Sequence, residues 1–229
     1  MMHSSEGTGF LTRFGVLRRR MSLKRIVTMS VFCLATLVIQ VGCGSVRYPK
    51  YYTLNLPAPP DPPPAGNVHA AVAIREFSAP AYLSQGAIVY KPSPEQIDFY
   101  AYHRWAINPR EFVTNSVIER LRASGDFARV KPYDGRPDTE YVLSGRLQKL
   151  EEIDYAGGVK VEVAISAQMT NLATGLTVWT NAVSEVGDVN KRDVPAVVSE
   201  MNRTMERAIT KLLSPMPADM ATGLRTERN

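Results

Sequence analysis

The chain has 229 residues, 45% of them hydrophobic, which suffices for one ordinary domain with targeting and tail segments and requires no second large core. Its formal charge of +5 suggests a polyanion-binding protein, but six of the 27 basic residues and one of the 22 acidic residues lie in residues 1–43. The rest of the chain is formally neutral, so the charge pattern argues against nucleic-acid binding.

Residues 1–42 have the pattern of a bacterial export signal. A basic stretch that ends at Arg25 precedes an apolar run from Ile26 to Val41, and small residues follow. As a helix this run would span about 24 Å, less than the ~30 Å hydrocarbon core of a bilayer. We therefore expect a signal peptide rather than a permanent transmembrane helix. Met21 would make an economical start of its own, and the sequence leaves the start open between residues 1, 2 and 21.

The two cysteines predict different fates. Cys33 lies within the apolar run and would be discarded with the signal peptide. Cys43 follows Val41 and Gly42, an arrangement similar to the bacterial lipobox, in which the cysteine carries diacylglycerol and, after cleavage, an N-acyl chain such as palmitate. Gln40 departs from that motif, where an aliphatic residue is usual.

We expect cleavage between Gly42 and Cys43, followed by lipid anchoring through Cys43. An ordinary signal peptide cleaved nearby is the alternative. Gly44 is not the aspartate associated with retention in the inner membrane, which favours the outer membrane, with the domain facing the periplasm.

The segment behind the cysteine, residues 43–66, combines the lipidated end, a strand predicted at Tyr51–Leu56 and a stiff proline-rich connector at 57–66. Val68–Phe77 is typical of a strand buried on both faces. Two short runs, 88–90 and 97–102, flank a proline-containing turn and predict a hairpin.

A helix should begin at Asn108, with Asn as N-cap and Pro109 in the first turn, and end at Gly125. After a short strand candidate at 127–133, three long strands are predicted at 141–154, 159–170 and 176–186, where alternation indicates an antiparallel meander.

Apolar residues at helical spacing predict a second helix over 193–213, and residues 214–229 are polar enough for a flexible tail. We thus predict one α+β domain over residues 67–213, a mostly antiparallel sheet with two amphipathic helices packed on one face.

Motifs for catalysis or metal binding are missing from the sequence. It has no nucleotide-binding P-loop, no Gly-x-Ser-x-Gly turn and no pair of histidines at a spacing suited to zinc. Glu151, Glu152 and Asp154 cluster near a predicted strand end, where we expect a solvated edge rather than acid–base catalysis. We predict a protein that is not an enzyme, with no metal and no cofactor besides the covalent lipid.

Aromatic residues are dense between positions 77 and 112. Their spacing assigns most of them to the core, but Tyr and Trp beside hairpin turns are also favoured at protein interfaces. The candidate interface residues in this region are Pro80, Tyr82, Leu83, Tyr90, Tyr102 and Trp105.

These same residues resemble the ABC-type transport auxiliary lipoproteins, a family that includes the lipoprotein of the paraquat-inducible transport system. The resemblance runs over about residues 48–213, through Tyr51-Tyr-Thr-Leu54, Pro80-Ala-Tyr-Leu83, Ile88-Val-Tyr90, Tyr102-His-Arg-Trp105 and Leu143-Ser-Gly145. Many members have Glu-Pro after Arg-Trp-Ala, where this chain has Ile107-Asn108-Pro109, so a role for that glutamate does not carry over.

The resemblance implies a lipid-anchored, non-catalytic component of an ABC/Mce-type envelope lipid transport system. Its partners would be an Mce-type periplasmic substrate-binding protein and, as separate chains, an ABC permease and an ATPase. In a homo-oligomeric ring of anchored subunits, the high local concentration would let weak contacts hold the complex together. The main alternative is a stand-alone envelope lipoprotein that assists assembly or holds an apolar ligand between its helices and sheet. The third hypothesis is a secreted enzyme, which a deep polar pocket in the structure would indicate.

Overall fold

The computed structural model describes residues 22–39, 46–59, 70–155, 157–214 and 216. The chain divides into two compact units, Met1–Val46 and Arg47–Asn229. The first contains helix α1 (Leu23–Ile39), formed by the apolar run of the predicted signal. No helix in the described ranges is both long and apolar enough to cross a membrane. Gly42 and Cys43 lie outside the described residues, so cleavage and lipidation there stay predictions.

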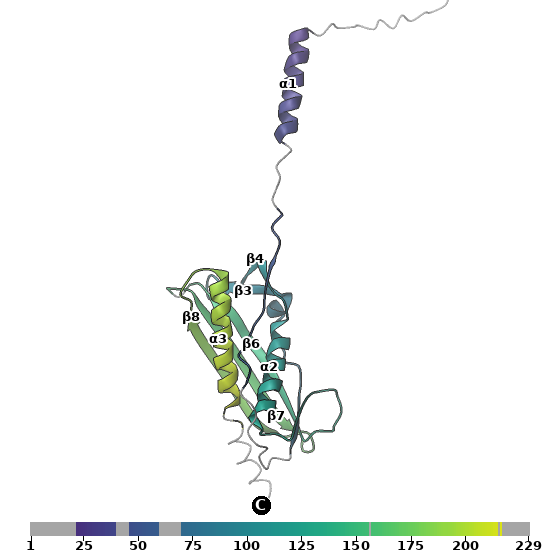
Figure 1. Cartoon of the computed structure of the whole chain (residues 1–229), viewed down its shortest axis with the longest axis vertical. Helices are drawn as coiled ribbons and strands as arrows, with labels where there is room; N and C mark the ends of the chain where they lie inside the picture. Colours follow the sequence, from purple (N-terminus) through teal and green to yellow (C-terminus); the bar gives the residue numbers. More distant parts are fainter. Residues whose placement is uncertain (1–21, 40–45, 60–69, 156, 215, 217–229) are drawn as a thin grey trace, which may run out of the picture. The chain divides into compact units, whose positions relative to one another are not determined.

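The second unit is built on an eight-stranded sheet whose middle strand is β6 (Figure 1). The strands are β1 (Lys50–Tyr52), β2 (Ala71–Ile74), β3 (Ala87–Lys91), β4 (Asp98–Trp105), β5 (Arg129–Pro132), β6 (Tyr141–Ile153), β7 (Lys160–Asn171) and β8 (Thr177–Asp188).

The predicted meander is present, since β6–β7 and β7–β8 pair antiparallel along almost their full lengths. The other edge of β6 is shared by two shorter strands, β2 at its beginning and β3 near its end, and both run parallel to it. β5 lies parallel to β2, β4 antiparallel to β3, and β1 parallel to β4. The α+β class is confirmed, while the sheet is mixed rather than strictly antiparallel.

A bulge near Gln148 resets the alternation of β6. Leu147 pairs with Ile165, whereas Lys149 already pairs with Ala164, so one extra residue is inserted in β6. Leu147 and Leu150, three positions apart, are therefore both fully buried against the helices.

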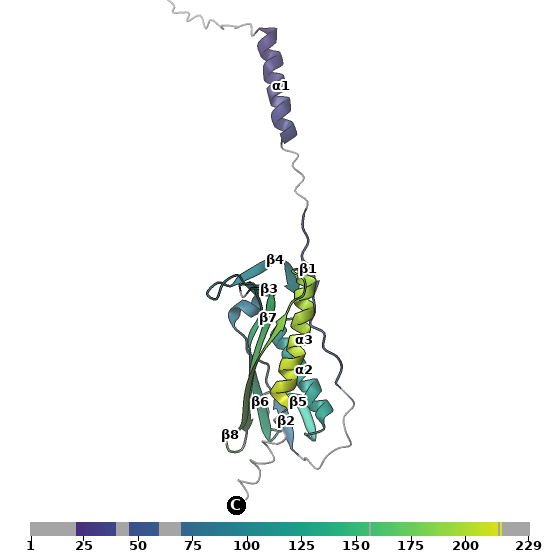
Figure 2. The same cartoon turned by 90° about the vertical axis from the view of Figure 1, so that its left-hand side faces the viewer.

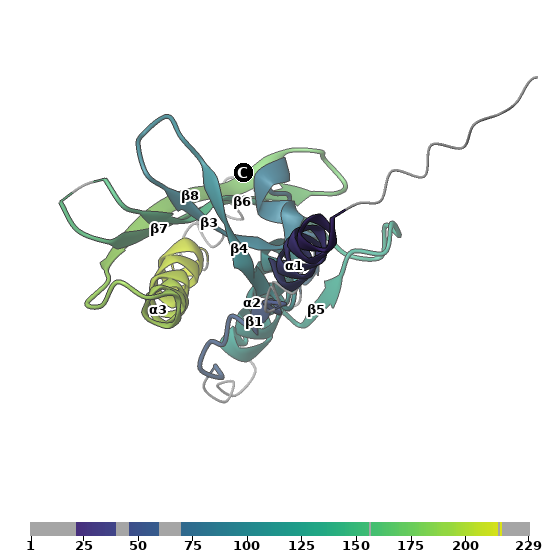
Figure 3. The ribbon, with the colours of Figure 1, turned by 90° about the horizontal axis from the view of Figure 1, so that it is seen from above.

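Two helices cover one face of the sheet, as predicted. Seen from the side and from above, α2 (Pro109–Ser124) and α3 (Val194–Leu213) lie on the same side of the strands (Figures 2 and 3). The Asn108 side chain accepts a hydrogen bond from the backbone N–H of Arg110, and Gly125 ends α2 at φ +72°, a conformation that favours glycine. Asp193 caps α3 by accepting from the Ala196 N–H.

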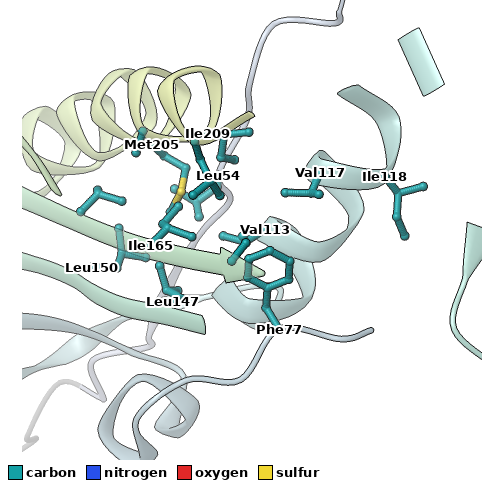
Figure 4. Packing of buried hydrophobic residues seen from close by; sticks show 14 of the residues in the cluster. Leu54, Phe77, Val113, Val117, Ile118, Leu147, Leu150, Ile165, Met205 and Ile209 are labelled. Carbon is teal, nitrogen blue, oxygen red and sulfur yellow. The ribbon is translucent and has the colours of Figure 1, made fainter. Parts of the chain in front are cut away.

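Leu54 links the N-terminal segment to the core. It follows the short strand β1 and packs in the cluster that also holds Met205, Ile209 and Ile165 (Figure 4). The Asn55 N–H donates to the Asn202 side chain of α3, and a small cavity beside α2 is lined by residues of the 55–59 stretch. Residues 53–59, which we call the strap, therefore occupy the groove between α2 and α3.

The chain crosses from β2 to β3 over Gly145 of β6. Ser78 bonds to the backbone of Gly145 and Leu147, so the crossing stays attached to β6. The Phe77 ring is 1% exposed and lies directly on Gly145, where an added Cβ would sit 2.1 Å from the ring Cε1. A side chain at position 145 would thus occupy the place of the ring.

Candidate functional site

The predicted interface residues all belong to one block, made of the 3-10 helix η1 (Ala81–Gln85) and the hairpin β3–β4. Pro80 precedes η1 and is half-exposed, and the Trp105 N–H donates to the Gly86 carbonyl at 2.8 Å, which ties β4 to the end of η1. Leu83 is 1% exposed and Trp105 6% exposed, so both are core residues that support the block from beneath.

Tyr82 closes η1 onto the outer face of β6. Its hydroxyl lies 3.3 Å from the Oε2 of Glu151 and donates there and to the Gln148 carbonyl. Burial, and next the neighbouring Glu151 carboxylate, raise the pKa of Tyr82 to about 12. The hydroxyl thus remains a donor at any physiological pH.

Glu151 and Glu152 are only 2% and 3% exposed, so the expectation of a solvated acidic edge is wrong. Glu151 lies beneath Tyr82, with the Lys91 Nζ 3.9 Å from its Oε1, and Glu152 accepts a 2.8 Å hydrogen bond from Tyr100. Burial is the main cause that raises the pKa of each carboxyl. Both carboxylates are held by hydroxyl donors, as buried charges require.

A row of aromatic rings continues from Glu152 to the edge strand β1. Tyr100 packs on Tyr90 with centroids 4.9 Å apart and on His103 at 5.6 Å. His103 in turn shares a 2.9 Å hydrogen bond between its Nδ1 and the Tyr52 hydroxyl. Burial, and then Lys50, lower the pKa of His103, so the ring is neutral at neutral pH. The row joins four strands and gives the block a fixed shape.

Of the six predicted residues, Tyr102 is the most accessible, with 45% of its surface exposed. Pro80, Tyr82 and Tyr90 are half-buried. Ile97 and Ile107, just before and just beyond β4, are also exposed apolar side chains, and the sequence analysis did not single them out. Both lie beside turns at positions outside the aromatic run, so an aromatic-density argument could not find them. The exposed apolar side chains of the block and its flanks are thus Ile97, Tyr102 and Ile107, with Pro80 and Tyr82 partly exposed.

Cavities elsewhere in the described part of the chain are modest. One of about 260 Å³ lies on the β6 and β7 strands and has Arg146 as the single ionisable residue of its lining. Another, about 430 Å³, is formed by the 137–140 and 171–173 loops. No group of three or more His, Cys, Asp or Glu side chains suited to a metal ion occurs in the described ranges.

Comparison with known proteins shows a family through one family model and a fold through solved structures. A family model described as the ABC-type transport auxiliary lipoprotein component matches residues 52–212. A crystal structure of a protein from Xanthomonas campestris is 17% identical with a TM-score of 0.66, and covers 79% of this chain and 100% of its own.

A second crystal structure, of an uncharacterized protein, is 14% identical with a TM-score of 0.59, covering 74% of this chain and 99% of its own. At these identities the two structures show a shared fold. The search of curated protein sequences gives no match.

Proposed function

Because this chain belongs to the ABC-type transport auxiliary lipoprotein family, we propose that it is a lipid-anchored, non-catalytic subunit of an envelope lipid transport system of the ABC/Mce type. The observation that carries the proposal is the extent of the match, residues 52–212, which runs from the last residue of β1 through α2 and strands β2–β8 to the last turn of α3. The permease, the ATPase and the Mce-type periplasmic protein are separate chains in this proposal, since this sequence contains no P-loop.

The anchor is the acylated Cys43 at the end of the predicted signal. Several acyl chains at ~0.8 kcal/mol for each buried methylene give stable attachment to a membrane. We assign the domain to the periplasmic side of the outer membrane, because position 44 is glycine. The domain would then hold the end of a periplasmic conduit at that membrane.

The docking surface for transporter subunits is the exposed part of the η1 and β3–β4 block. Its apolar side chains Ile97, Tyr102 and Ile107 are 40–48% exposed, and they stand on a support that the buried Leu83 and Trp105 fix in place. Aromatic and aliphatic anchors on a rigid base are the usual basis of affinity in a protein interface. Anchored subunits gathered in a ring would present several copies of this surface and multiply a weak contact.

The filled groove between α2 and α3 weakens the alternative of a stand-alone ligand-binding lipoprotein. An acyl chain would have to enter where Leu54 of the strap already packs, 7% exposed, against α3. Burying a leucine side chain stabilises the fold by about 1.5–3 kcal/mol, and a ligand that displaces Leu54 would have to offset this free energy with its own contacts. The docking function does not require the groove to open.

The first test is the intact mass of the membrane-extracted protein beside a Cys43→Ala variant, with the partners in each extract identified. A chain that starts at Cys43, carries acyl mass and retains a permease and an Mce-type protein would support the proposal. A lipid-free chain without partners would refute it. Lipid that copurifies with the domain alone would favour the ligand-binding alternative.

The docking surface has its own test. Ile97→Asp with Tyr102→Asp should release the transporter subunits, because both side chains are exposed and neither change disturbs the core. Leu176→Asp is the matched control, since Leu176 is a 60% exposed apolar residue on the β7–β8 turn, outside this block. Unchanged copurification with the double variant would contradict this assignment.

A further inference from the structure

The strand β1 and the residues just before it carry an exposed set of alternating aromatic and basic side chains. Tyr48 is 80% exposed and Tyr51 63% exposed, among the largest exposures of any apolar side chain in the second unit. Arg47 and Lys50 are exposed beside them, and Arg104 pairs with Tyr51 in the β1–β4 register. Lys50 points to one face of β1, whereas Tyr51 and its pair partner Arg104 point to the other, so these side chains flank the open edge of the sheet on both sides. We call Arg47, Tyr48, Lys50, Tyr51 and Arg104 the tether patch.

Within the described residues, none of these five side chains makes a hydrogen bond or an ion pair. Lys50, Tyr51 and Arg104 take part in β1–β4 pairing through their backbones, while their side chains stay exposed. Arg47 contacts Tyr102, with its guanidinium 5.9 Å from the ring centroid. Residues 46–59 contain no acidic residue, and Asp98, the one acid of β4, is bonded to Tyr90. Asp193 of the α3 cap acts electrostatically on Tyr52 but is paired with Lys191. In the described part of the chain the tether patch is therefore a cationic surface whose basic side chains form no ion pair.

The composition of the tether patch matches the boundary of a phospholipid bilayer. Tyrosines place an apolar ring and a polar hydroxyl at the headgroup level, and lysine and arginine are attracted to anionic headgroups. We propose that the tether patch lies on a membrane surface and binds anionic phospholipid headgroups, so that the domain is oriented by its own side chains as well as tethered.

Chain length makes this contact reachable. Lys50 is seven positions after Cys43, so the link between lipid and strand extends at most about 25 Å. A domain held that closely meets the membrane repeatedly, and the high local concentration allows a weak electrostatic contact to be occupied. This step rests on the proposed anchor at Cys43. The headgroup contact itself does not, and it can be tested with an artificial tether.

The test uses residues 44–229, which include the complete second unit with every residue of its hydrophobic core. This fragment has no cysteine, so Gly44→Cys provides a single thiol for coupling to a maleimide lipid in preformed vesicles. Amide hydrogen exchange is then compared on phosphatidylcholine vesicles and on vesicles with about a third phosphatidylglycerol. We expect slower exchange in peptides spanning 46–52 and 101–106 on the anionic vesicles, and loss of that difference at high salt.

Two matched double variants decide the outcome. Lys50→Glu with Arg104→Glu should abolish the lipid-dependent protection, whereas Arg136→Glu with Lys160→Glu changes the net charge equally and should preserve it. Equal protection in both variants, or none in the unaltered fragment, would overturn the proposal while leaving the transport function standing. A patch variant that loses transporter subunits in cells, without any lipid-dependent protection of the fragment, would assign the tether patch to a protein partner instead and also overturn it.

Discussion

Gly145→Ala tests the packing that fixes the crossing between β2 and β3. The new Cβ would lie 2.1, 2.4 and 2.6 Å from three carbons of the Phe77 ring, where ordinary contacts begin at about 3.4 Å. The ring must therefore move by more than an ångström within a core where it is 1% exposed. Overpacking of this kind costs about 1–3 kcal/mol, and complete expulsion of the phenyl ring would cost about 3–5 kcal/mol.

We expect Gly145→Ala to lower the free energy of unfolding by about 2–3 kcal/mol, measured by denaturant titration of residues 44–229. Gly158→Ala is the matched control, because a Cβ at that turn meets nothing within 4 Å and the residue does not have a positive φ. Its effect should stay within about 0.5 kcal/mol.

A double-mutant cycle isolates the ring as the cause. With Phe77→Ala already in place, adding Gly145→Ala should cost almost nothing, since the space occupied by the ring is free. If Gly145→Ala is as mild as Gly158→Ala, or equally damaging with and without the ring, the reasoning is wrong.

Three further changes test other parts of the structure. Gly187→Ala places a Cβ 2.0 Å from the Oε1 of the buried Glu200, so the carboxylate must move. The free energy of unfolding should fall by about 1–3 kcal/mol in the same denaturant titration, and an unchanged value would contradict the close approach. Leu54→Ala should lower the free energy of unfolding by about 2–5 kcal/mol and speed amide hydrogen exchange in residues 53–59. Faster exchange in β1 alone would show that this side chain does not anchor the strap. Glu152→Gln keeps an acceptor for the Tyr100 hydroxyl but removes the charge. Because burial raises the folded pKa of Glu152, its ionisation destabilises the fold as pH rises from the unfolded pKa through the folded one. The variant should gain stability at about pH 8 and none at about pH 4, and a gain that is equal at both pH values would refute the argument.

Local patterns predicted the elements whose partners are close in sequence. The cap at Asn108, the stop at Gly125, the apolar stripe of α3 and the three-strand meander all appear as expected. Each depends on periodicity or turn chemistry within a few residues. The parallel pairings β2–β6, β3–β6, β2–β5 and β1–β4 join segments far apart in the chain, and no local pattern specifies them.

In the candidate site too, local sequence indicates some features, while others depend on contacts between distant segments. The aromatic density at 77–112 predicts an interface there, but sequence alone could not separate the buried Leu83 and Trp105 from the exposed Tyr102. Glu151 and Glu152 were misjudged because acids near a strand end usually face water. Here Tyr82 and Tyr100, from distant segments, cover the two faces of β6 at that point. Burial of such residues depends on tertiary contacts, which periodicity does not contain.

The strap sets an order of assembly for the molecule. Its groove has α3 as one wall, and α3 comes more than 140 residues later in the chain, as the Asn55 to Asn202 hydrogen bond shows. Closing a loop of that size is slow compared with forming the local helices and the meander. The segment next to Cys43 thus docks only after the last helix has formed. On the export and anchoring route proposed above, this order would leave the segment that follows Cys43 undocked, and so accessible to processing enzymes, until the rest of the domain is folded.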